Sequence, residues 1–391
     1  MTVNFPNGFL WGAASASHQI EGGNWNNDWW AFEHQPGTPC KEPSGDACDS
    51  YHRFGEDIAL VRDLGLGAYR FSIEWSRIEP EDGEFSRAAL DYYRRVLATC
   101  HEHNVQPVVT FHHFSTPRWM AALGGWENEQ IVDRFGRYCE RAVAHLGDLI
   151  AIGCTINEPN IVSLMGYMLG AFPPGRSDRA AYAVVNDNLK SAHRRAYDVL
   201  KSGPGDFPVG SCVAMGDWWA PVGAEAMLEK ARYRHEGQHL EILKGDDFVG
   251  VQAYSRTRLN PEGRAVGPEE GVEVVPSMSY EFWPNALNVA IRHAAEVAQT
   301  PIYVTENGLG HHDDTRRIAY VQGALEGLGS CLADGIDVRG YFYWSLLDNF
   351  EWALGYGPQF GLAAVNRETF ARTPKPSAAW LAQIARTNRL S

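Results

Sequence analysis

The sequence alternates between short runs typical of buried strands and longer segments with helical periodicity. Most of the strand-like runs are dense in apolar, β-branched or aromatic residues without strict alternation, as expected of strands buried on both faces. They lie at 9–15, 67–72, 106–112, 149–156, 208–214, 247–253, 301–305 and 338–344. Helical segments follow at 51–64, 87–103, 131–146, 180–200, 223–243, 284–298, 315–333 and 376–387. Eight strand–helix units predict an α/β fold, a closed (β/α)8 TIM barrel.

A doubly wound open sheet is the alternative arrangement of alternating strands and helices. That fold usually carries a glycine-rich GxGxxG turn after its first strand, and none follows residues 9–15 here. The chain also has no Pro/Ser-rich linker or low-complexity tract, and 391 residues lie within the size range of barrels with insertions. We therefore expect one catalytic domain over residues 1–391.

Charge and cysteine content limit the possible partners. With 48 acidic and 34 basic residues, the net charge of −14 repels phosphate backbones, so no nucleic-acid partner is expected. No apolar run approaches the roughly 20 residues that span a bilayer, and the N-terminus lacks the pattern of a signal peptide. Seven scattered cysteines fit reduced thiols. These features predict a cytoplasmic protein without a membrane partner.

Aromatic residues are abundant and often stand beside polar groups. The chain has 13 Trp, 16 Tyr and 17 Phe, with segments such as NWNNDWW, GDWWAP and YFYWSLLDNFEW. Packing of a large core accounts for part of this surplus. The other interpretation is a set of platforms for a ligand with flat apolar faces and a rim of hydroxyls, which is the shape of a sugar.

Polar side chains follow every predicted strand, where the active sites of barrel enzymes lie. In chain order, they and the aromatic residues beside them are His18, Gln19, Glu21, Arg70, Glu74, Trp75, His112, His113, Asn157, Glu158, Asp217, Trp218, Trp219, Gln252, Tyr254, Glu306, Asn307, Trp344, Asp348, Asn349, Glu351 and Trp352. We expect these residues to form one hydroxyl-binding mouth.

Two carboxylates stand out in this set. Glu158 (CTINEPN) and Glu306 (YVTENG) each end a strand-like run, on the fourth and seventh strands, which lie on opposite sides of an eight-stranded ring. Glycoside hydrolysis uses such a pair, with a proton donor on one side of the anomeric carbon and a carboxylate on the other. A separation of about 5–5.5 Å would make the reaction retaining, and about 6.5–9.5 Å would make it inverting. The sequence alone does not give this separation, so both the retaining and the inverting reaction stay open.

Longer segments resemble a known family. FLWGAASASHQIEG, AYRFSIEWSRIEP, TINEP, YVTENG and GYFYWSLLDNFEWALGYGPQFGL are similar to the signature segments of family 1 of the glycoside hydrolases, in that family's order, from residue 9 to about 380. The resemblance implies a retaining β-glycosidase, in the first place a β-glucosidase with some tolerance at the 4- and 6-positions of the sugar. It implies a small-molecule glycoside as substrate, a covalent glycosyl intermediate, and no metal or organic cofactor.

The resemblance also assigns roles to individual residues. It makes Glu158 the acid/base and Glu306 the nucleophile, with Arg70 and Tyr254 hydrogen-bonded to the nucleophile and Asn157 bound to the sugar 2-hydroxyl. The residues implied to hold the other hydroxyls and the face of the sugar are Gln19, His113, Trp344, Glu351 and Trp352. His112 is expected to pack, Asp348 and Asn349 to fix their loop, and His18 to support the site from behind.

The chain departs from the family pattern in three places. His113–Phe114 replaces a His–Trp pair, and Gln252-Ala253-Tyr254 replaces Asn-Tyr-Tyr. The chain is also shorter than is usual, chiefly between 220 and 247, which predicts an open leaving-group site with Trp218 and Trp219 as platforms. The carboxylate of Glu351, and the absence of lysine from GYGPQF, disfavour 6-phosphorylated sugars.

Three other functions compete with this interpretation. A metal-dependent barrel hydrolase could use His112, His113 and Glu158, but such sites usually gather His and Asp ligands from several strand ends. A sugar-binding protein without activity would normally lack one of the two carboxylates. A transglycosidase, which passes the glycosyl unit to an alcohol, uses the same residues and is not separated from a hydrolase by the sequence.

Overall fold

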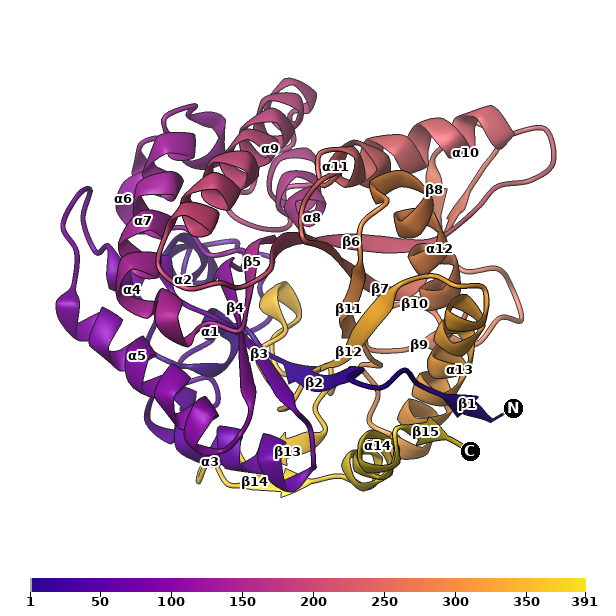
Figure 1. Ribbon diagram of the computed structural model, residues 1–391. Coiled ribbons are helices and arrows are strands. Elements are labelled where there is room, and N and C mark those ends of the chain that lie inside the picture. The colour runs from indigo at the N-terminus through magenta and orange to yellow at the C-terminus, as the bar shows by residue number, and fades with distance from the viewer. Residues whose placement is uncertain (1) are drawn as a thin grey trace.

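The computed structural model describes residues 2–391 and has a closed parallel barrel at its centre. The strands follow one another around the ring, and β11 pairs with both β7 and β12 (Figure 1). The barrel strands are β2 Leu10–Ala14, β3 Ala68–Ser72, β4 Gln106–His112, β5 Ile152–Asn157, β6 Val209–Trp219, β7 Phe248–Leu259, β11 Ile302–Asn307 and β12 Val338–Trp344. The predicted TIM barrel is confirmed.

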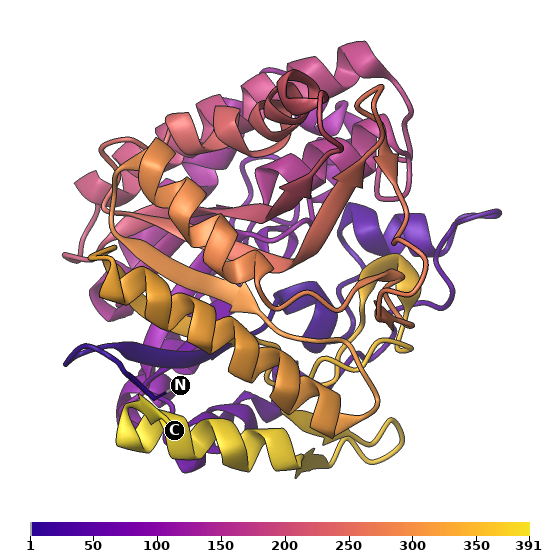
Figure 2. The ribbon, with the colours of Figure 1, turned by 90° about the vertical axis from the view of Figure 1, so that its right-hand side faces the viewer.

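The long helices cover the outside of the barrel, and Figure 2 shows α12, α13 and α14, from orange to yellow, lying across it. They are α3 Ser50–Asp63, α5 Arg87–Glu102, α7 Ile131–Leu146, α9 Arg179–Ser202, α12 Ala286–Ala298, α13 Asp314–Ala333 and α14 Pro376–Thr387. Each has one apolar face: α7 buries Ile131, Phe135, Tyr138 and Ala142 at intervals of three or four residues. The apolar residues whose spacing predicted the helices are therefore the ones that the helices bury.

Shorter elements complete the chain. The short helices are α1 Ser17–Ile20, α2 Asp28–Glu33, α4 Trp75–Ile78, α6 Arg118–Ala122, α8 Pro159–Ser163, α10 Glu225–Arg232 and α11 Gln238–Glu241, with 3-10 turns η1 Gly125–Glu127, η2 Gly147–Leu149 and η5 Trp352–Leu354. Two π-helical turns, η3 Leu164–Met168 and η4 Tyr233–Gly237, continue α8 and α10. The short strands are β1 Val3–Asn4, β8 Ala265–Val266, β9 Val274–Val275, β10 Tyr280–Glu281, β13 Ala363–Val365, β14 Arg372–Pro374 and β15 Arg389–Leu390.

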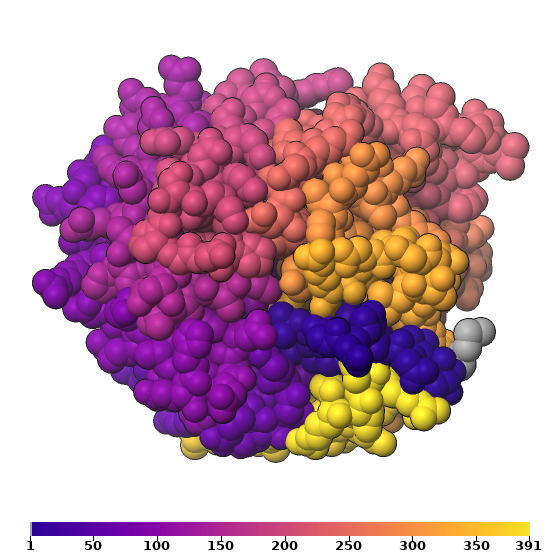
Figure 3. All heavy atoms as spheres, in the orientation of Figure 1, coloured from indigo at the N-terminus to yellow at the C-terminus, as the bar shows by residue number. Residues whose placement is uncertain are grey.

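The two ends of the described chain lie together. Val3 in β1 pairs with Leu390 in β15, and the Trp11 indole donates a hydrogen bond to the Asn388 side chain at 3.0 Å. Figure 3 shows the indigo start and the yellow end of the chain side by side on one face. Both short strands lie against α13.

Strands β6 and β7 run further than predicted. The sequence indicated ends near 214 and 253, but the two strands stay paired up to Trp219 and Arg258, with a register shift after Met215. Beyond the barrel they are no longer buried on both faces, so their composition becomes polar and resembles that of a loop. The paired extension builds one wall of the cavity described below.

The barrel interior is packed with side chains beneath that cavity. A cluster including Ala14, Ala68, Val108, Phe248 and Phe342 fills it, as expected of small and large residues from successive barrel strands. All seven cysteines are free thiols, and six of them are buried. Within residues 2–391, no helix is long and apolar enough to cross a membrane.

Candidate active site

A cavity of about 460 Å³ opens at the carboxyl ends of the barrel strands, a volume suited to a small-molecule ligand. Glu158 and Glu306 both line it, together with Glu351 and the aromatic rings of Trp344 and Trp352. The structure thus brings the two carboxylates from β5 and β11 to the same space.

The Glu306 carboxylate is held by two strong donors. Its Oε1 accepts a hydrogen bond from Nη1 of Arg70 at 2.7 Å, and its Oε2 accepts one from the Tyr254 hydroxyl at 2.6 Å. Burial raises the pKa of Glu306, while Arg70 and Tyr254 lower it by stabilising the ionised form. The side chain therefore has one donor on each oxygen and a buried cation beside it.

Arg70 also fixes the orientation of Asn157. Its Nη2 donates to Oδ1 of Asn157 at 2.5 Å, and Nε2 of Gln252 donates to the same oxygen at 2.9 Å. Because arginine has no acceptor, Asn157 must present its oxygen here. Its Nδ2 has no hydrogen-bond partner within residues 2–391 and remains a spare donor next to Glu158. Gln252, one methylene longer than the usual asparagine, still reaches Asn157.

Glu158 stands in a strained backbone conformation. It lies between β5 and α8 with φ 44° and ψ 61°, in the left-handed region that non-glycine residues rarely adopt. Phe114 (φ 70°) and Trp352 (φ 51°) are also left-handed, and all three line the cavity. Strained residues that gather around one cavity are typical of a functional site.

The surroundings of Glu158 differ from those of Glu306. Burial raises the pKa of Glu158 well above its usual range, and the negative charge of Glu306 raises it further. No cation is hydrogen-bonded to it in the part of the chain that the structure describes, and the opposing effect of Arg70 is smaller. The two carboxyls are thus suited to different protonation states, with the proton on Glu158.

Rings and amides surround the rest of the cavity. His113 stacks near Trp344 and Trp352, at 5.7 and 6.1 Å between ring centroids, and burial holds its pKa well below the usual value, so the ring is neutral. Gln19 lies behind Glu351, and its Nε2 donates to the Phe350 carbonyl at 2.8 Å and to Glu351 at 3.4 Å. Its Oε1 has no partner in the described chain. Burial raises the pKa of Glu351 to about 8, with Glu306 adding to the effect.

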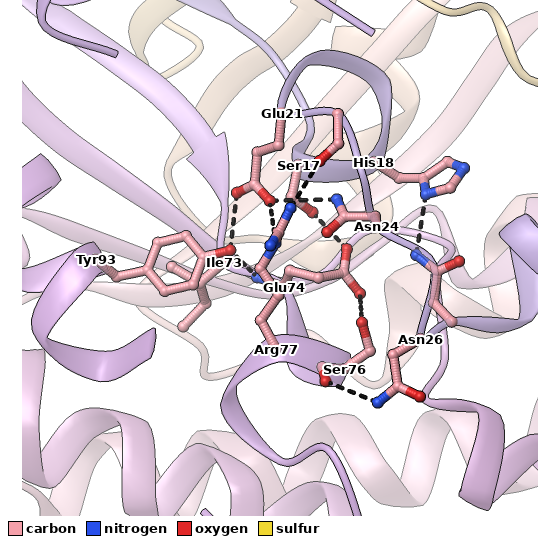
Figure 4. A network of polar contacts seen from close by, with 12 residues as sticks. Ser17, His18, Glu21, Asn24, Asn26, Ile73, Glu74, Ser76, Arg77 and Tyr93 are labelled. Atoms are coloured by element: carbon pink, nitrogen blue, oxygen red, sulfur yellow. Dashed lines mark hydrogen bonds and ion pairs between the residues drawn. The ribbon is translucent and has the colours of Figure 1, made fainter. Parts of the chain in front are cut away.

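A buried polar network around Glu21 and Glu74 joins loops that carry residues of the site (Figure 4). Glu74 accepts hydrogen bonds from the hydroxyls of Ser17 at 2.8 Å, Ser76 at 2.8 Å and Ser115 at 2.9 Å, which belong to the loops after β2, β3 and β4. Glu21 accepts hydrogen bonds from Tyr93, at 2.7 Å, and from Arg77, at 2.9 Å. Glu21 and Glu74 therefore hold the loops and do not line the cavity.

Removing the Glu74 carboxylate should destabilise the protein. Glu74→Ala leaves three buried serine hydroxyls without their acceptor, so we expect the free energy of unfolding to fall by about 2–4 kcal/mol. Urea unfolding measures the change. Glu84→Ala, an exposed glutamate nearby, is the control and should have little effect. Equal unfolding midpoints for the two variants would contradict the role given to Glu74.

Comparison with known proteins identifies the family. The family model "Glycosyl hydrolase family 1" matches residues 1–259 and 251–390. The chain belongs to glycosyl hydrolase family 1. It is 33% identical to Beta-glucosidase A of Thermotoga maritima over 440 residues, covering 99% of this chain and 98% of the relative. It is 31% identical to Beta-glucosidase A of Acetivibrio thermocellus, covering 99% of both.

Solved structures agree with this family 1 assignment. The crystal structure of beta-glycosidase BGL167 has a TM-score of 0.91 and 47% identity, covering 98% of this chain and 97% of the other. The Thermotoga maritima beta-glucosidase in complex with deoxynojirimycin has a TM-score of 0.93 at 30% identity, with both chains fully covered. The family 1 chain described here is an O-glycoside hydrolase. Alignment with the Thermotoga relative takes 440 positions, more than the 391 residues here, so the relative has inserted residues at positions where this chain has gaps.

The neighbouring tryptophans of β6 have different places in this family 1 enzyme. Trp218 lines the cavity, and its indole donates a hydrogen bond to Glu236 at 2.5 Å. Trp219 does not line it: its side chain is 39% exposed, and Arg258 lies 4.8 Å above its ring. Successive residues of a strand point to opposite sides, so the prediction of two adjacent platforms was wrong for Trp219.

The structure also places the residues that were expected to support the site without binding the sugar. His18 stacks on Trp352 at 5.8 Å and lies outside the cavity wall. His112 packs edge-on against Trp126 at 5.0 Å, and burial lowers its pKa to about 3. Asp348 pairs with Lys375 at 2.7 Å, which anchors the loop after β12. In the described chain, no three His, Cys, Asp or Glu side chains form a group that could hold a metal ion.

Sequence reasoning did not single out the two π-helical turns. Met165 in η3 and His235 and Glu236 in η4 line the cavity. Such turns are rare and are frequently found at functional sites. A π turn inside a helical segment leaves no clear sequence signal, because it adds one residue to a turn without changing the apolar character of the segment.

Proposed function

We propose that the protein is a retaining β-glycosidase, a β-glucosidase that releases terminal β-D-glucosyl units. The observation that carries the proposal is the contrast between two carboxyls in one cavity. Glu306 has a cation and a hydroxyl bonded to it, and Glu158 has neither. The names of the family relatives, β-glucosidases among them, support the choice of sugar and anomer.

In the first step, Glu306 attacks the anomeric carbon and forms a glycosyl ester. Arg70 and Tyr254 hold its carboxylate in place and keep it ionised before the attack. Glu158 gives its proton to the leaving oxygen as the bond to the aglycone breaks. The raised pKa of Glu158 suits it to this donation.

In the second step, Glu158 acts as a base. Once Glu306 is esterified its negative charge is gone, and with it the repulsion that raises the pKa of Glu158. The Glu158 pKa therefore falls, and its carboxylate can accept a proton from the water that attacks the ester. Release of the sugar restores the charge on Glu306 and returns both groups to their starting states.

Polar atoms on and behind the cavity wall support binding of a sugar rather than an apolar group. Nδ2 of Asn157 and Oε1 of Gln19 are buried with no partner within residues 2–391, and both residues lie behind the wall and do not line it. His113, Glu351 and the rings of Trp344 and Trp352 supply further polar atoms and flat faces. A 6-phosphate would bring negative charge into a cavity that already holds the Glu306 carboxylate, which disfavours phosphorylated sugars.

A panel of p-nitrophenyl glycosides tests the proposal. With EDTA present, we expect strong turnover of the β-glucoside, weaker turnover of the β-galactoside and β-fucoside, and none of the α-glucoside or the 6-phospho-β-glucoside. Release of nitrophenol measures each rate. Absence of turnover on every β-glycoside, or loss of activity with EDTA, would contradict the proposal.

The pH profile should depend on the same two groups. Activity needs Glu306 ionised and Glu158 protonated, and the pKa of each is raised above 4.5. We therefore expect kcat/KM to fall below the Glu306 pKa and to fall again above the higher Glu158 pKa, the two limbs belonging to the coupled pair. In Glu158→Ala, assayed with an activated aryl glucoside, the basic limb should disappear. Its persistence would contradict the role of Glu158.

A further inference from the structure

One arginine stands on the cavity wall beyond the reaction centre. Gln252 and the run Tyr254, Ser255, Arg256 and Thr257 of β7 line the cavity. Tyr254 contacts Glu306, and Arg256 follows it after an irregularity in the pairing with β6. Arg256 therefore lies beyond Tyr254, on the extension of β7 that leaves the barrel.

The Arg256 side chain is fixed in place by the protein. Its Nε donates a hydrogen bond to Glu281 at 2.5 Å, and its guanidinium carbon lies 3.5 Å from the centroid of the Trp283 ring. Trp283 is held in turn by a hydrogen bond from its indole to Asp217 at 2.8 Å. With only 12% of its side chain exposed, Arg256 is ordered before any ligand binds, which lowers the entropy cost of binding.

The terminal nitrogens of Arg256 are unused. Over residues 2–391, neither Nη1 nor Nη2 has a hydrogen-bond partner, although Arg256 is the one Lys or Arg on the cavity wall there. Arg70 differs, because all three of its nitrogens are bonded within the protein. Arg258, the next arginine along β7, forms ion pairs with Glu281 and Glu269 and does not line the cavity. Arg256 thus presents a charged donor pair to whatever fills this part of the cavity.

The cavity wall also carries apolar side chains beyond the two carboxyls. Ile161 and Met165 follow Glu158 along α8 and η3, and Met215 and Trp218 extend from β6. Methionine side chains adapt to flat ligands, and the Trp218 ring is held by its bond to Glu236. These side chains offer flat, adaptable apolar contacts to an aromatic ring beside the polar groups of His235 and Glu236.

We infer that the leaving group is an aromatic alcohol that carries a carboxylate, with the ring against these apolar side chains and the carboxylate bound by Nη1 and Nη2 of Arg256. This inference rests on the proposed function, because it takes Glu158 as the group that protonates the leaving oxygen. Arg256 is a specificity-determining residue for the leaving group and takes no part in breaking the bond.

Phenyl, 4-carbamoylphenyl and 4-carboxyphenyl β-D-glucosides test the inference, with kcat/KM measured at about pH 7, where the carboxyl group is ionised. Arg256→Met should lower kcat/KM for the carboxyphenyl glucoside by about 10- to 100-fold, as expected for loss of a hydrogen bond to a charged group. The carbamoyl compound should lose less and the phenyl glucoside least. Each variant is compared with the wild type on the same glucoside, so differences in leaving-group reactivity cancel.

Arg258→Met is the matched control, because it removes the same charge and another partner of Glu281 without touching the cavity. It should affect the three glucosides equally. If Arg256→Met also affects them equally while the wild type hydrolyses all three, the leaving-group inference is overturned and the proposed function stands. If the wild type releases no phenol from any of them, the proposed function fails and the inference with it.

Discussion

Glu306→Gly should lower the rate of hydrolysis of aryl β-glucosides by about 10⁵-fold or more, the size of effect seen when a nucleophile is removed. The substitution removes the oxygen that would bond to the anomeric carbon, and it leaves Arg70 and Tyr254 without their shared partner. Release of nitrophenol from p-nitrophenyl β-glucoside measures the loss.

Added azide should restore turnover in Glu306→Gly. The small anion can enter the space left by the side chain and attack from the same side, so the product should be the α-glucosyl azide. Restored activity also shows that the variant is folded. A β-glucosyl azide, or hydrolysis close to the wild-type rate without azide, would contradict the assignment of Glu306.

Glu158→Ala should have an effect that depends on the leaving group. A dinitrophenyl glucoside needs little proton donation, so its kcat/KM should change by about 10-fold or less, while that of the phenyl glucoside should fall by about 10²- to 10⁴-fold. Azide should accelerate breakdown of the intermediate in this variant and give the β-glucosyl azide, because it enters from the side that Glu158 occupied.

Glu236→Gln is the matched control for Glu158→Ala. Glu236 is another buried carboxyl on the cavity wall, and burial raises its pKa to about 8. Glutamine can still accept the hydrogen bonds from Trp218 and the Gly216 amide. Glu236→Gln should change kcat/KM by the same factor for the dinitrophenyl and the phenyl glucoside. A leaving-group dependence in Glu236→Gln instead of Glu158→Ala would move the acid role to Glu236.

The sequence predicted the barrel well because its strands are buried on both faces. The runs 106–112 and 338–344 coincide with β4 and β12, since apolar character ends where the strand leaves the barrel. The extensions of β6 and β7 were missed for the same reason: beyond Met215 and Tyr254 the strands face solvent or a cavity and carry polar residues such as Asp217. Pairing between the two strands keeps them extended there.

The sequence predicted which residues form the candidate site, but not how buried each side chain is. Position at a strand end was enough to place Glu158 and Glu306 in one cavity, as the structure does. The resemblance already paired Arg70 with Glu306, and the structure has this hydrogen bond, but the shift in the pKa of each carboxyl depends on burial that no local pattern reveals. Arg256 was missed because β7 was expected to end near residue 253, before the extension that carries it.

Trapping the covalent intermediate tests the central claim most directly. A 2-deoxy-2-fluoro-β-glucosyl substrate with an activated leaving group should form the glycosyl ester and then react slowly with water, because fluorine destabilises the positively charged transition state of both steps. Mass spectrometry of the intact protein and of its peptides should find one fluoroglucosyl group per chain, attached to Glu306. An adduct on another residue, or continued turnover with no adduct, would contradict the account.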